Sequence, residues 1–159
     1  MYISFKKNTG SFVDNLISYF TKSEIIHCEL VTTKSTKDNA FYGYSSYPGE
    51  GVRCSWIGID DNWIILPLNK TKFKDLKAQD VKDFYEKTKG RKYDWLGCLG
   101  FVFGNHDNPK RYFCSEWCAT VMGIENPSKI SPAKLYEIIK DSEGAKGAKG
   151  AKGAKDTEC

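Results

Sequence analysis

The chain has 159 residues and a mass of 18.0 kDa, which is the size of one domain. Its residues are 40% hydrophobic, 14% aromatic and 28% charged, a composition that can bury a core and excludes a disordered chain. The longest apolar run, residues 95–103, is far shorter than the ~20 residues of a membrane-spanning helix. The stretch MYISFKKNTG at the N-terminus lacks the apolar core of a secretory signal, so we expect a cytoplasmic protein without a transmembrane segment.

The C-terminal stretch differs in composition from the rest. Residues 144–155 repeat GAK four times without one large apolar side chain. Residues 141–159 contain four lysines and four acidic residues, so the formal charge of +4 belongs to the remainder. We therefore expect one domain over 1–140 and a flexible low-complexity tail over 141–159.

Hydrophobic patterning predicts the elements in chain order. Five helices are expected, at 11–21, 79–89, 93–103, 113–122 and 131–140. Four strands are expected, at 24–33, 40–46, 52–57 and 63–68. Ser11 is the expected cap of the first helix, and Pro67 marks the end of the last strand or an edge position. Strands first and helices afterwards indicate an α+β fold with a mostly antiparallel sheet packed by helices.

The cysteines do not suggest a metal site. There are six of them, at positions 28, 54, 98, 114, 118 and 159, with no CxxC pair among them. We expect no metal and no cofactor, and most of these thiols are expected to be small buried side chains in a reducing compartment.

One cysteine is placed for nucleophilic chemistry. Cys114 falls at the expected start of a helix, where the dipole and the unpaired amides favour a thiolate. A strand histidine, His27, could complete a Cys–His pair with it, and the same amides could hold an oxyanion. The alternative is structural, because Cys118 lies one turn further on the same helical face and both thiols could be core.

Three blocks of sequence carry a resemblance. The first block runs from ISF at 3–5 to HCEL at 27–30. The second contains YSSYP and GVR within 44–53. The third contains KYD at 92–94, FCSEWCA at 113–119 and ISP at 130–132. In this order they resemble the circularly permuted branch of the NlpC/P60 papain-like superfamily, especially short phage-encoded members. The blocks span nearly all of 1–140, with histidine first and cysteine last. The tail has no counterpart in the resemblance.

The resemblance implies a papain-like NlpC/P60 fold with Cys114 as nucleophile and His27 as base. Related enzymes place a His, Asn, Gln or Glu as a third residue that orients the histidine. A hairpin centred near 36–37 would put Ser46 opposite position 27, with Tyr44 and Glu29 on the same face. Ser46 has the better inferred position and Glu29 the better chemistry, so the choice among Ser46, Tyr44 and Glu29 stays open.

The function implied is a cysteine hydrolase of amide bonds, that is, a thiol peptidase or amidase. The phage-like resemblance favours peptidoglycan of the bacterial cell wall as substrate and a virion component as its setting. Two alternatives stay open. One is a non-catalytic structural or interaction module of a phage particle, tethered to phage structural proteins by the tail. The other is a lipid acyltransferase or thioesterase.

The segment 70–92 is the most basic part of the chain, with nine basic residues against four acidic ones. Such a run is usually a solvated helix face. The alternative is a contact patch for an anionic polymer such as nucleic acid, teichoic acid or acidic lipid.

Overall fold

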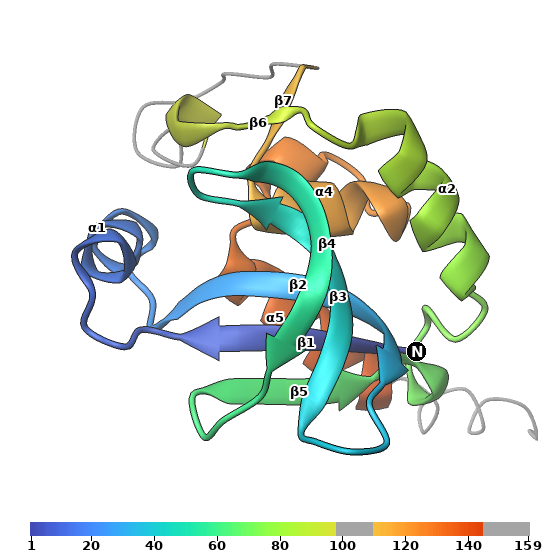
Figure 1. Cartoon of the computed structure of the whole chain (residues 1–159). Helices are drawn as coiled ribbons and strands as arrows, with labels where there is room; N and C mark the ends of the chain where they lie inside the picture. The colour runs from blue at the N-terminus through green and yellow to red at the C-terminus, as the bar shows by residue number, and fades with distance from the viewer. Residues whose placement is uncertain (98–109, 145–159) are drawn as a thin grey trace, which may run out of the picture.

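Five antiparallel strands form the sheet on which the rest of the chain is built (Figure 1). The computed structural model describes residues 1–97 and 110–144. The strand order is β4-β3-β2-β1-β5. Their bounds are β1 (Tyr2–Lys7), β2 (Ile25–Lys34), β3 (Ala40–Tyr47), β4 (Gly51–Gly58) and β5 (Trp63–Pro67). Over these residues the chain is α+β, with an antiparallel main sheet as the patterning predicts.

Strand β1 is the element that the patterning missed. It lies between β2 and β5, so it pairs on both edges. Ile3, Ser4 and Phe5 are all fully buried, because both faces of this central strand are covered. The buried run covers only these three residues, which is too short for sequence patterning to separate from a loop.

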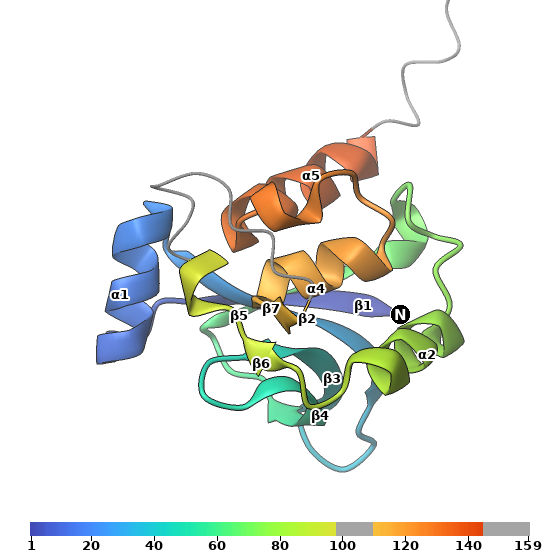
Figure 2. The same cartoon turned by 90° about the horizontal axis from the view of Figure 1, so that it is seen from above.

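Helices cover one face of the central strands. The sheet bends so that strands β3 and β4 lie on the opposite side of these strands. Figure 2 shows α4 (Cys114–Val121) and α5 (Pro132–Gly144) above β1 and β2, with β3 and β4 below them. Helices α1 (Phe12–Thr21) and α2 (Ala78–Thr88) lie at opposite ends of the sheet. Shorter elements complete the fold: the 3₁₀ turns Leu68–Lys70 and Pro127–Lys129, and the parallel pair β6 (Lys92–Tyr93) and β7 (Arg111–Tyr112).

The main core lies between the sheet and helices α4 and α5. Its largest fully buried side chains include Phe5 and Leu30 from the strands and Trp117, Leu135 and Ile139 from the helices. Each such side chain contributes about 1.5–3 kcal/mol through the hydrophobic effect, so this layer fixes where α4 begins relative to β2.

Two sequence expectations are corrected. The helix expected over 93–103 does not begin at Tyr93, which is in β6, because its backbone pairs with Tyr112; residues 95–97 are helical, and 98–103 lie outside the described residues. Helix α5 runs to Gly144, four residues beyond the expected end of that helix at Lys140. In its last turn Ser142 is buried and donates to Ile139 O.

The helices and the basic segment 70–92 can each be compared with the sequence expectations. Within residues 1–97 and 110–144, no helix is long and apolar enough to cross a bilayer. All eight lysines of segment 70–92 are exposed, and α2 turns only Val81 and Thr88 fully inward. This pattern fits a solvated helix face.

The contact between α2 and α4 yields a first prediction. The fully buried Trp117 donates its indole N–H to Thr88 Oγ1 at 3.0 Å. Thr88→Val keeps the shape but leaves that N–H without an acceptor, so we expect a loss of about 1–3 kcal/mol in the free energy of unfolding, measured with urea. Thr88→Ser keeps the acceptor and is the control. Equal stability of the valine variant and the wild type would contradict this role.

Candidate functional site

Cys114 is the first residue of α4, as the sequence predicts, and only 2% of it is exposed. The helix begins here because Phe113 is extended and its carbonyl accepts the first helical bond, from Trp117 N–H at 3.0 Å. The Glu116 carboxylate accepts the Phe113 N–H at 3.3 Å. Helix geometry gives the amides of the first turn no intrahelical acceptor, so the thiol lies at the positive end of the helix.

The Cys114 thiol lies beside the beginning of β2, close enough to Cys28 and His27 for both to shift its pKa. Burial alone raises the pKa of Cys114, but the hydrogen bonds from Cys28 and the positive charge of His27 hold that pKa well below the usual thiol value. Burial alone lowers the pKa of His27, yet the Cys114 thiolate and the Glu29 carboxylate raise it to about 9. Both shifts favour a thiolate–imidazolium pair over two neutral side chains.

Glu29 orients the imidazole. Its Oε1 lies 3.0 Å from His27 Nε2, and its side chain has no exposed surface. Positions 27 and 29 point to the same face of β2 because strand side chains alternate. A carboxylate only accepts hydrogen bonds, so Nε2 carries the hydrogen and Nδ1 is the ring nitrogen left for the thiolate of Cys114.

The structure places the other two candidates away from the histidine. The Ser46 hydroxyl donates to Tyr112 O at 2.7 Å, so it ties β3 to the residues just before α4 and does not orient His27. Tyr44 lies in the main core and packs against Tyr85.

The cause is the register of the β2–β3 hairpin. A β-bulge between Val31 and Thr33 shifts the pairing, so that Leu30 lies opposite Tyr44. Tyr47 is therefore the β3 residue whose ring packs on His27, with 5.1 Å between ring centroids. Of the three residues left open by the sequence, the structure brings only Glu29 into contact with the imidazole.

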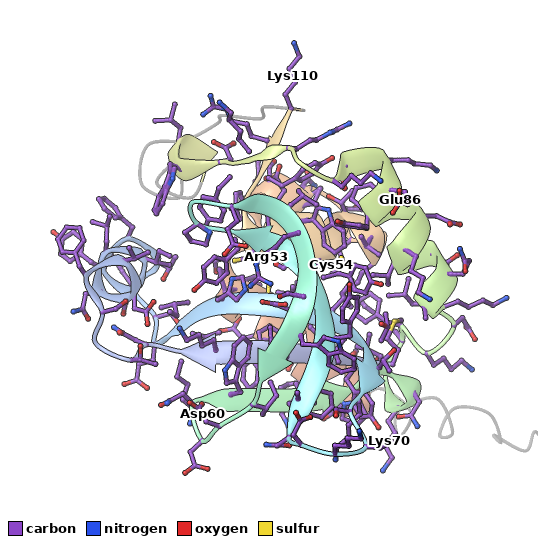
Figure 3. All side chains as sticks on the ribbon, in the orientation of Figure 1. Arg53, Cys54, Asp60, Lys70, Glu86 and Lys110 are labelled. Carbon is purple, nitrogen blue, oxygen red and sulfur yellow. The ribbon has the colours of Figure 1, made fainter. Side chains whose placement is uncertain are left out.

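Sequence reasoning assigned no role to Arg53 or Gly43, and both touch Glu29. Arg53 Nη2 donates to Glu29 Oε1 at 3.1 Å. In Figure 3, Arg53 lies on the side of β4 toward α1, above β2, while its neighbour Cys54 lies on the side of α2. Gly43 leaves the space that the Glu29 carboxylate occupies, because a Cβ there would overlap Oε2. Gly43 pairs with Val31 and lies diagonal to Glu29, so no local sequence signal links the two residues.

The remaining thiols near the site are reduced and buried. Cys28 and Cys118 are free, and Cys118 Sγ lies 3.8 Å from Cys28 O. Burial and the neighbouring sulfurs raise the pKa of Cys28 well above the usual thiol value, so it remains a hydrogen-bond donor to Cys114. Across the part of the chain that the structure describes, no three His, Cys, Asp or Glu side chains gather as a metal site.

Two cavities flank the turn between β3 and β4. One, of about 350 Å³, opens beside His27 and is lined by Ile17 and Asp14 of α1 and by Tyr47, among others. The other, of about 500 Å³, is lined by Glu50, three glycines, two aromatic rings and the basic side chains of Lys92 and Arg111. Of these two cavities, only the first is lined by the His27 imidazole.

No family model matches the chain, and no curated protein matches it. Its functional class is therefore inferred from the side chains of the site.

The fit of Glu29 against β3 gives a second prediction. Gly43→Ala places a methyl group on the Glu29 carboxylate and 3.3 Å from Ile57 Cδ1, so we expect a loss of about 1–3 kcal/mol in unfolding free energy. Gly58→Ala is the matched control in the neighbouring strand, because its Cβ would meet nothing within 4 Å. Urea unfolding measures both, and equal stability of the two variants would contradict the close fit.

Proposed function

We propose that this protein is a cysteine hydrolase of amide bonds, with Cys114 as nucleophile, His27 as general acid and base, and Glu29 as the residue that orients the imidazole. One observation carries the proposal. A buried thiol at a helix start lies beside a strand imidazole that shifts its pKa, and Nε2 of that imidazole lies 3.0 Å from a buried carboxylate. This is the arrangement of an activated nucleophile, its base and an orienting group.

The first half of the reaction forms an acyl-enzyme. The Cys114 thiolate attacks the carbonyl carbon, and the amides of the first turn of α4 stabilise the negative charge that develops on the carbonyl oxygen. The His27 imidazolium gives its Nδ1 proton to the leaving amine as the C–N bond breaks. The product is a thioester on Cys114 and a neutral imidazole, with the amine released.

The second half hydrolyses the thioester. Neutral His27 takes a proton from water, whose oxygen attacks the thioester carbonyl. The C–S bond breaks, the acid leaves, and the thiolate–imidazolium pair is restored. Glu29 keeps the Nε2–H in place through both halves, so the same ring nitrogen serves as acid and then as base.

The proposal extends to a circularly permuted papain-like fold and to peptide bonds of the bacterial cell wall, cleaved by a component of a phage particle. The order of a histidine strand before a cysteine helix supports the permuted arrangement. The sequence blocks described above support the substrate, and the cavities beside His27 and near Lys92 offer room for a peptide.

The pair of pKa values predicts a bell-shaped dependence of kcat/KM on pH. Activity requires the Cys114 thiolate and the His27 imidazolium together. The imidazolium is lost as the pH rises through about 9, so the alkaline limb should lie near pH 9. The acid limb should lie well below the usual thiol pKa of about 8.5, because the Cys114 pKa is lowered. A profile still rising at pH 9 would contradict the ion pair.

Substitution of the two helix cysteines separates chemistry from packing. Cys114→Ala should abolish hydrolysis of peptidoglycan or a fluorogenic peptide amide at little cost in stability, because it removes only the nucleophile. Cys118→Ala is the control one turn deeper; it should cost about 1–2 kcal/mol from a small cavity and leave turnover within several-fold.

Alkylation gives a readout that needs no substrate. Iodoacetamide should modify Cys114 at pH 6 faster than any other cysteine, and His27→Ala should slow it by about tenfold for each unit that the thiol pKa rises. Hydrolysis by the Cys114→Ala variant would overturn the mechanism. Equal labelling of all accessible thiols would favour the non-catalytic module.

A further inference from the structure

We propose that Arg53 is a positioning residue of the Cys114–His27 pair, which acts through Glu29 by holding its carboxylate and offsetting its charge. The contacts of Arg53 are independent of the proposed function, and only its effect on turnover rests on that function.

Arg53 reaches Glu29 across strand β3. It pairs with Ser45 in the β3–β4 ladder, and the small side chains of Gly43 and Ser45 leave room for the guanidinium on this face. Its Nη2 lies 3.1 Å from Glu29 Oε1, and Arg53 and Glu29 side chains are 16% and 0% exposed. A pair this deeply placed is little screened by salt.

Other contacts fix the guanidinium so that it cannot swing away. Arg53 Nη1 donates to Ser55 Oγ, and Nε forms an ion pair with Glu50 Oε2 at 3.3 Å, without the geometry of a hydrogen bond. The guanidinium carbon lies 4.6 Å from the centre of the Tyr47 ring, the same ring that packs on His27. A planar fork that makes several directed contacts is a task for arginine and not for lysine.

Glu29 Oε1 receives both cationic groups. His27 Nε2 and Arg53 Nη2 both lie about 3 Å from it, whereas Oε2 is buried without a hydrogen-bond partner among the described residues. The guanidinium and the imidazole therefore share the negative charge of one oxygen. With Arg53 present, Glu29 stabilises the imidazolium less than an uncompensated buried carboxylate would.

Within residues 1–97 and 110–144, few other charged and titratable groups lie around His27. They are Cys114 from α4, Cys28 from its own strand, Tyr47 from β3, and Lys6 of β1 with Asp14 of α1. Lys6 and Asp14 form an ion pair at 3.6 Å and largely cancel. Arg53 is thus the positive charge that limits how strongly Glu29 acts on the imidazole.

This role has a chemical consequence. In the proposed reaction, His27 must give its proton to a leaving amine, and an imidazolium of higher pKa is a weaker acid. Removing Arg53 should therefore raise the pKa of His27 and slow acyl-enzyme formation.

The test is a titration of the histidine rings by NMR, which needs no substrate. The chain has two histidines, His27 and His106, so two ring signals are followed, and His27→Ala assigns them. The wild-type His27 should titrate near pH 9. Arg53→Met should raise that pKa by roughly half a unit or more, because a positive charge close to the carboxylate is lost. Arg53→Lys should restore at least half of the shift. Glu50→Gln, which changes only the exposed end of the network, should leave the pKa unchanged.

The stability and the His27 pKa of the neutral Arg53 variants decide whether Arg53 positions the pair. Arg53→Gln, neutral but able to donate to Glu29, replaces the methionine variant if that variant does not fold. A folded neutral variant with an unshifted His27 pKa would overturn the proposal, as would failure of both neutral variants to fold, since Arg53 would then serve stability alone. Failure of the proposed function shows separately: the His27 pKa would then stay near its wild-type value in Cys114→Ala.

Discussion

Burying the Glu29 carboxylate in the middle of the sheet constrains the strands around it. An isolated buried charge costs several kcal/mol, so its neighbours must supply hydrogen bonds and positive charge and must also leave space. The structure meets these conditions from three strands. His27 and Arg53 bond one oxygen, and Gly43 leaves room for the other. The location of the imidazole, and with it the site that Cys114 faces, follows from this one buried group.

The site is a row of four groups whose charges alternate in sign. A thiolate on Cys114 faces the imidazolium of His27, which faces the carboxylate of Glu29, which faces the guanidinium of Arg53. Their sum is zero, which is why such groups tolerate burial in the protein interior. In the proposed reaction, the imidazolium loses one positive charge when it gives up its proton. The thiolate loses one negative charge when it becomes a thioester. The row is therefore neutral again in the acyl-enzyme intermediate.

Much of this fold follows from local sequence, and the reasons for the failures are physical. Strands β2 to β5 and helices α1, α2 and α4 were predictable, because their patterning and caps are local signals. The placement of Cys114 at a helix start was predictable from local signals as well. Strand β1 was missed because its buried run is only three residues long. The partner of His27 stayed ambiguous because both the centre of the β2–β3 hairpin and a bulge between Val31 and Thr33 decide which β3 side chain faces it. Arg53 could not be found because its contact with Glu29 spans three strands.

The chain order of the row has a consequence for synthesis. His27, Glu29 and Arg53 lie within 27 positions of one another in a meander of neighbouring strands, whereas Cys114 follows 61 positions after Arg53. Local hairpins close early and at low entropic cost, while a helix that packs on β2 from so far along the chain arrives last. Until α4 docks on β2, the Cys114 sulfur lacks the neighbours, His27 and Cys28, that lower its pKa. In the proposed mechanism the nucleophile is therefore activated only once the domain is complete.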